Sequence, residues 1–308
     1  MTGYVKNAAG DLYALPPLIE WEVLRCGGED GCDSFYCVFP AEAADAAVLE
    51  GALTFHANYE GKRVFTGVVD EISLSLSDRG RLARIDGRGM CARLIDNQTR
   101  SADYDSAQLS DILRDYVSPY GITTIAAPLP PVQRFSVDTG DTCRQAVWGY
   151  VRHAGGEAPR FDAEGRLLIC QPGNRFTLTE AAAPTEAAFT RTRYGVLSEV
   201  VEVRAGTGAD VRVTKNSAFE GLPSRKVTVV SGSTQRAERR TGAQHIARSK
   251  LDSRTVQVHL PGVFLAEPDD ICTLNLPNLG ISGEFTVRTV RSSMDTHGAR
   301  CIITMGGT

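Results

Sequence analysis

Hydrophobic and polar residues alternate with a period of two along most of the chain, which is typical of strands with one buried face. In the segment Ile72–Leu76 an isoleucine and two leucines take one face and serines take the other. Short turn signals, Glu60 with Gly61 and later Ser77–Gly80, separate successive alternating runs. Because turns this short join antiparallel strands, the pattern predicts two consecutive hairpins.

Helical periodicity, with apolar residues three and four positions apart, occurs in three segments. The first is capped by Ser106 and ends before Pro119, and the second is capped by Asp141 or Thr142 and ends at a pair of glycines. The third covers residues 234–251 and is rich in arginine. The residues predicted to form its buried side are Ala243, Ile246, Ala247 and Leu251.

The order of these elements predicts a mainly β protein with an α/β insertion, an α+β fold. Residues 1–98 are expected to form a first β-domain, 99–190 a small helix-containing α/β domain, and 191–308 a second β-domain with one helix. In the middle domain, residues 161–169 form a hairpin-like pair around a glycine. The segment Thr179–Thr190, rich in alanine and threonine, is expected to be an exposed connection.

A weak internal repeat relates the two β-domains. Residues 65–89 begin with Phe-Thr, reach a polar turn and return to a glycine-rich end, and residues 285–307 do the same. The two segments have similar length, and each closes its β-domain. The sequence therefore predicts two related hairpins.

Charge and hydropathy exclude several classes of protein. The formal net charge of −4 over 308 residues argues against a protein whose main task is to bind nucleic acid. No run of about 18 apolar residues occurs, so we expect no membrane insertion. The N-terminal residues lack the charged start and apolar core of a secretory signal, so we expect folding in the cytosol.

The eight cysteines are spread through the chain, mostly in apolar runs, and we expect them to be buried, reduced thiols. Only Cys26, Cys32 and Cys37 cluster. Their spacing is wider than the close pairs of a zinc site, and no second pair accompanies them. We therefore expect no metal and no cofactor.

The string Asp138-Thr139-Gly140 resembles the catalytic turn of aspartic proteases, which need two such carboxylates to share a proton. No second copy occurs, so a strand end followed by a helix cap explains the string better. Nucleophile elbows, phosphate-binding loops and His-Glu-x-x-His motifs are also absent from the sequence. We therefore expect no catalytic residues.

Four motifs occur in the order found in one family of phage proteins. The residues of the first motif, a long hairpin followed by a short apolar run, are Phe65, Gly67, Gly87, Arg88, Leu94, Ile95 and Asp96. A helix-opening turn at Thr142, the pair at 161–169 and a strand at 281–287 follow. In these motifs the chain resembles phage baseplate hub proteins of the late control protein D type.

The resemblance implies a homotrimer in which each chain supplies two similar antiparallel β-barrel domains of the tail-tube type, flanking the helix-containing domain. Six barrels would then form a pseudo-sixfold ring that adapts the hexameric tail tube protein to the central spike protein. Tape-measure and baseplate wedge proteins are further implied partners, and DNA is met only by passage through the channel. The implied location is the virion tail baseplate, after assembly in the bacterial host cytoplasm.

Two other classes of function stay open. A tail-tip module that binds a receptor or carbohydrate needs exposed aromatic residues, whereas Trp21 and Trp148 lie in apolar runs. A tail-associated hydrolase needs an acid, a base and a nucleophile that converge in one pocket.

The two-faced pattern of the hairpins at 68–87 and 285–305 predicts that both lie on the wall of the central ring; the alternative is that both are ordinary exposed edges of two separate barrels. Ile72, Leu74 and Leu76 need a core, so the serines between them face the lumen or a close-packed seam. The second hairpin, Phe285–Met305, alternates less regularly. The interface residues predicted in this way are Ser73, Ser75, Ser77 and Arg288.

Overall fold

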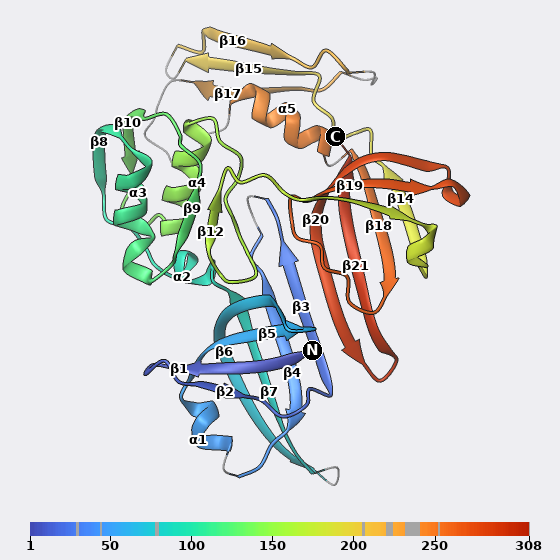
Figure 1. The fold of residues 1–308 in the computed structure, drawn as a ribbon. Coiled ribbons are helices and arrows are strands. Elements are labelled where there is room, and N and C mark those ends of the chain that lie inside the picture. The colour runs from blue at the N-terminus through green and yellow to red at the C-terminus, as the bar shows by residue number, and fades with distance from the viewer. Residues whose placement is uncertain are drawn as a thin grey trace.

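A computed structural model describes residues 1–28, 31–43, 45–77, 80–204, 207–219, 224–231, 241–251 and 253–307. Within this part of the chain, strands dominate, and most of them join one thirteen-stranded sheet (Figure 1). Smaller sheets and the longer helices lie beside it. The expectation of a mainly β protein with helical insertions is confirmed at this level.

The N-terminal β-unit contains the first half of the large sheet. Its elements are β1 (Thr2–Asn7), β2 (Leu12–Ala14), β3 (Glu20–Cys26), β4 (Ser34–Pro40), α1 (Asp45–Glu50), β5 (Ala52–Tyr59), β6 (Lys62–Ser77) and β7 (Gly80–Gly89). Both predicted hairpins are confirmed, because β5 pairs with β6 and β6 pairs with β7, each antiparallel. Phe35, Phe55 and Phe65 form the centre of the core, and the first two rings stack with centroids 4.2 Å apart.

The helix-containing unit has its own core around Phe135 and Tyr150. Its elements are α2 (Ala92–Ile95), β8 (Ala102–Ala107), α3 (Leu109–Tyr116), η1 (Ser118–Tyr120), β9 (Thr124–Ala126), β10 (Val132–Val137), α4 (Cys143–His153), β11 (Arg160–Phe161) and β12 (Leu167–Ile169). Thr142 caps α4 as predicted, in a capping box with Gln145. The cap predicted for α3 is wrong: Ser106 is paired within β8, and Gln108 takes the N-cap position instead.

The second half of the large sheet forms the C-terminal β-unit. Its elements are β13 (Arg175–Thr179), η2 (Glu180–Ala182), β14 (Glu186–Arg191), β18 (Arg254–Pro261), β19 (Ile271–Leu276), η3 (Pro277–Leu279), β20 (Ile281–Asp295) and β21 (Gly298–Gly307). The expected connection Thr179–Thr190 is mostly exposed, but it is not irregular, since β14 pairs with β18. By pairing, β13 and β14 therefore belong with the C-terminal strands.

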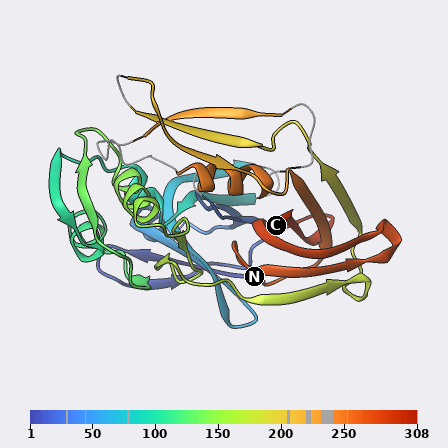
Figure 2. The ribbon, with the colours of Figure 1, turned by 90° about the horizontal axis from the view of Figure 1, so that it is seen from above.

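A separate small layer is inserted between β14 and β18. It consists of β15 (Glu199–Arg204), β16 (Asp210–Lys215), β17 (Lys226–Ser231) and α5 (Gly242–Leu251). Figure 2 shows α5 between this sheet and the rest of the molecule. The N-terminal part of the helix predicted at 234–251 lies outside the described residues. Its predicted buried side is partly wrong, because Ile246 is buried whereas Ala243 and Ala247 are exposed.

The two β-units contain the same four-stranded motif. In the first, chain order β4, β5, β6, β7 gives sheet order β4-β7-β6-β5, and in the second β18 to β21 give β18-β21-β20-β19. Each motif contains one of the two predicted long hairpins, and each hairpin has a register shift near its open end, between Val69 and Glu71 or between Val287 and Thr289. The weak sequence repeat is therefore a duplication of topology.

One strand pair joins the two units into a continuous sheet. The outer half of β20 pairs antiparallel with β3, from Thr289 opposite Cys26 to Met294 opposite Trp21. The hairpin of the C-terminal unit thus lies directly against the N-terminal unit (Figure 1).

Candidate functional site

The β6–β7 hairpin, called the first hairpin below, exposes apolar side chains along residues 71–77 of β6, its outer arm. Leu74 is 50% exposed and Leu76 is 77% exposed, whereas Ile72 is half-buried. The expectation that all three enter a core of this chain is therefore wrong. On the opposite face Ser73 and Ser75 are exposed, and the side chain of Ser77 lies outside the described residues.

The arm is exposed because one of its edges has no partner among the described strands. β6 pairs with β7 along its whole outer half, but it pairs with β5 only as far as Val68. Residues 71–77 therefore present a free backbone edge together with two leucines. Such an edge readily pairs with a strand of another chain.

Arg288 lies away from the outer arm of its hairpin. It occupies the register shift between Val287 and Thr289 and is half-buried, and its carbonyl oxygen accepts a 2.8 Å hydrogen bond from the Gly27 amide. The structure thus does not bring Arg288 together with Ser73 and Ser75. Roles for these residues at a ring wall stay a prediction.

A buried ion network holds the three larger units together. Arg25, at the end of β3, donates to Asp33 at 2.8 Å and to the carbonyl oxygen of Phe161 in the helix-containing unit at 2.8 Å. Glu267, which precedes β19, lies 3.7 Å from Arg25 and 3.4 Å from Arg160. A single guanidinium thereby contacts all three units.

The charges in this network depend on one another. Burial alone lowers the pKa of Arg25, but the carboxylates of Asp33 and Glu267 outweigh it and raise that pKa above its ordinary value. Burial raises the pKa of the Asp33 and Glu267 carboxyls, against the opposing positive charge of Arg25. Sequence reasoning missed the network, although one signal existed: Arg25 takes an inward position in the alternation of β3.

The residues that carry the family resemblance meet where the first hairpin contacts α2. A Cβ on Gly67 would lie 2.3 Å from the Arg88 carbonyl oxygen, and one on Gly87 would lie 2.0 Å from the Val68 carbonyl oxygen. Both positions therefore require glycine. The Arg88 guanidinium makes bidentate contacts with Asp70 and with Asp96, so it links the bulge of β6 to the end of α2.

The string Asp138-Thr139-Gly140 forms a turn. The amide of Asp138 donates to the Asp141 carboxylate at 3.2 Å, and Thr139 accepts from the Ser101 amide at 3.0 Å. Among the described residues no cluster of three or more His, Cys, Asp or Glu side chains could hold a metal ion. Both tryptophans, Trp21 and Trp148, are buried.

The described cysteines are all free thiols. None of the described helices is long and apolar enough to cross a membrane.

No protein-family model and no curated protein sequence matches this chain. Its fold is similar to that of the 43 kDa tail protein of prophage MuSo2 from Shewanella oneidensis, with a TM-score of 0.76, 18% identity, and 99% of this chain and 98% of that chain covered. A tail protein from Neisseria meningitidis gives a TM-score of 0.74 at 16% identity, with 99% and 96% covered. A type VI secretion component from E. coli gives 0.58 at 10% identity, with 94% and 73% covered. The chain therefore has the fold of prophage tail proteins, as its resemblance to baseplate hub proteins implied.

Proposed function

We propose that this chain is a structural baseplate hub of a phage or phage-like tail, which forms a trimeric ring between the tail tube and the central spike. The observation that carries the proposal is the duplicated four-stranded motif. Two equivalent units per chain allow three chains to present six positions to a hexameric tube. The E. coli protein of similar fold is described as structurally similar to the T4 tail proteins gp27 and gp5.

The exposed arm supports the same proposal. Two leucines beside a free strand edge are unfavourable in water and suit a contact with another copy. Native mass spectrometry of the purified chain and of assembled particles tests the oligomeric state. We expect a trimer, and a monomer or a hexamer in the finished particle would exclude the hub ring.

Leu76→Asp tests whether the arm lies in a contact between chains. Since Leu76 is 77% exposed, the variant should fold with the circular dichroism spectrum of the wild type but fail to form trimers, and its Tm should fall only by the part that association contributes. Ile125→Asp is the control, because Ile125 is also an exposed hydrophobic residue, at 37%, but lies in β9 of the helix-containing unit. Normal trimers of Leu76→Asp would remove the arm from the interface.

Ser75→Trp tests the placement of the serine face on the ring wall. The serine is exposed, so the folded chain should tolerate the larger side chain. We expect trimers that do not assemble onto the tube. Normal assembly would place the serine face elsewhere.

A further inference from the structure

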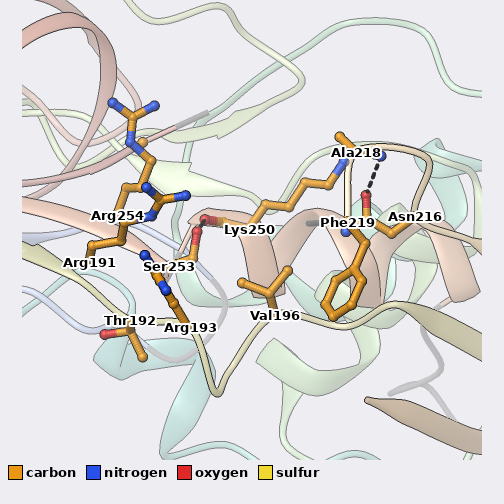
Figure 3. A pocket seen from close by; sticks show the side chains of 11 residues that line it. Arg191, Thr192, Arg193, Val196, Asn216, Ala218, Phe219, Lys250, Ser253 and Arg254 are labelled. Carbon is orange, nitrogen blue, oxygen red and sulfur yellow. Dashed lines mark hydrogen bonds between the residues drawn. The ribbon is translucent and has the colours of Figure 1, made fainter. Parts of the chain in front are cut away.

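A basic pocket of about 400 Å³ lies between the C-terminal β-unit and the inserted layer. Figure 3 shows three arginines and a lysine around it, together with Ser253, Asn216 and the apolar side chains of Val196 and Phe219. The four cations are Arg191, Arg193, Lys250 and Arg254. No acidic side chain is among the described residues that line the pocket. The pocket is therefore suited to a negatively charged group.

The duplicated motif shows which residues of the two units are equivalent. Counted from the hairpin turns, Arg88 of β7 corresponds to Gly306 of β21. Arg88 pairs with Ser34 of β4, and Gly306 pairs with Thr255 of β18. The strand next to β4 is β3, and the strand next to β18 is β14. β3 and β14 therefore occupy equivalent places.

This equivalence places Arg191 where the N-terminal unit has Arg25. Arg25 follows Leu24, the residue opposite Ser34, and forms a buried ion pair with Asp33, whereas Arg191 pairs across the sheet with Arg254. Like charges directly opposite each other destabilise a sheet. Part of that cost is removed when a carboxylate binds between them, and among the described residues none does so.

The second partner of Arg25 indicates which carboxylate is missing. Glu267 lies five residues before Cys272 of β19, and Glu50 lies five residues before Phe55 of β5, the equivalent position in the N-terminal unit. Glu267 belongs to the C-terminal unit and contacts Arg25 of the N-terminal unit. A second copy, joined in the same way, would bring its Glu50 to Arg191. Glu50 is exposed at the end of α1 and has no ion pair among the described residues.

We propose that the basic pocket binds the acidic end of α1, at Glu50, from a second copy of this chain. The free strand edges fit this contact, since β14 ends the large sheet and the outer half of β6 lacks a second partner. Within the chain, Ser292 of β20 lies opposite Val23 of β3. The equivalent residues are Leu74 of β6 and Phe189 of β14, so the same pairing between two copies places Leu74 opposite Phe189. Both are large, exposed hydrophobic residues, Leu74 at 50% and Phe189 at 41%, and the contact covers them together.

A nucleic acid is a poorer occupant of this pocket. Binding along a phosphate backbone uses a track of successive cations, whereas these four surround one recess with an apolar side formed by Val196 and Phe219. The inference rests on the proposed function, because it names the contact that closes the trimeric ring.

Charge reversal tests the contact. We expect Arg191→Glu and Glu50→Arg each to raise the concentration needed for half-maximal trimer formation about tenfold or more, because each places like charges in the contact. The double variant should recover part of this loss, since the reversed pair attracts again while Arg193 and Arg254 remain. Arg100→Glu, an exposed arginine in the helix-containing unit, is the control and should trimerise normally.

Trimer formation is measured by sedimentation and native mass spectrometry, and folding by circular dichroism. If the wild type and the single reversals form trimers at the same concentration, the α1 contact is wrong and the ring stands. The same conclusion follows if the double variant needs as high a concentration for trimer formation as the more impaired single variant. If the wild type never forms trimers, both proposals are wrong. If Arg191→Glu abolishes binding of a short single-stranded DNA and leaves trimers intact, the pocket serves a polyanion and the α1 contact is again wrong.

Discussion

Replacing Arg25 by methionine should strongly destabilise the chain, because it leaves a buried carboxylate without its cation. Arg25 is 5% exposed and donates to Asp33 at 2.8 Å and to the Val64 and Phe161 carbonyl oxygens at 3.1 Å and 2.8 Å. Breaking a buried ion pair from one side costs about 3–5 kcal/mol. The two carbonyl groups add about 1 kcal/mol each when they lose their donor.

Urea unfolding as a function of pH measures this loss. Without Arg25 the pKa of Asp33, which burial already raises above 3.8, rises further, so the folded variant holds the proton more tightly than the unfolded chain does. Its free energy of unfolding therefore falls as the pH increases from about 4 towards that raised pKa, and is greatest below this window. The loss relative to the wild type should therefore increase as the pH rises through the same window.

Arg84→Met is the matched control, because Arg84 forms an ion pair with Asp86 in which both side chains are more than a third exposed. Surface pairs of this kind contribute about 1 kcal/mol or less. Equal losses for the two variants, or an Arg25→Met loss independent of pH, would refute the buried network.

Three smaller changes test other parts of the fold by urea unfolding and circular dichroism. Gly87→Ala should cost about 3 kcal/mol or prevent folding, because its Cβ would lie 2.0 Å from the Val68 carbonyl oxygen. Thr142→Ala should cost about 1 kcal/mol through loss of the α4 cap, and Thr142→Ser should recover most of it. At concentrations where the chain is monomeric, Leu74→Asp should cost less than about 1 kcal/mol, since Leu74 is 50% exposed, and a loss as large as that of a core residue would contradict its place on the arm.

The local elements could be predicted from the sequence because their signals are local. Glu60 and Gly61 both have positive φ, as a two-residue hairpin turn between twisted strands requires. The α4 cap was likewise visible in a Thr142 followed three residues later by Gln145. Ser106 misled the α3 prediction, because a serine before an apolar periodic run fits an edge strand as well as a cap.

The long-range pairings could not be predicted from such signals. β3 and β20 are more than 250 residues apart in the chain, as in the pair of Trp21 with Met294. β13 lies parallel to β19, and the inserted layer of β15 to β17 packs on α5 with a core that includes Val200 and Ile246. Alternation within a strand specifies one apolar face, but it does not specify which distant strand lies beside that face.

The same limit explains why the apolar face of the first hairpin was assigned to a core of this chain. Ile72, Leu74 and Leu76 follow the same alternation as Val290 and Met294 of the second hairpin, and only the latter lie against β3. An alternating pattern indicates that one face of a strand is buried, but it does not indicate whether the same chain or another copy buries it. In this chain β3 covers the outer half of β20, whereas the equivalent half of β6 has no second partner among the described strands. The pairing of β20 with β3 therefore indicates the register and the residue types expected of a strand that pairs with β6.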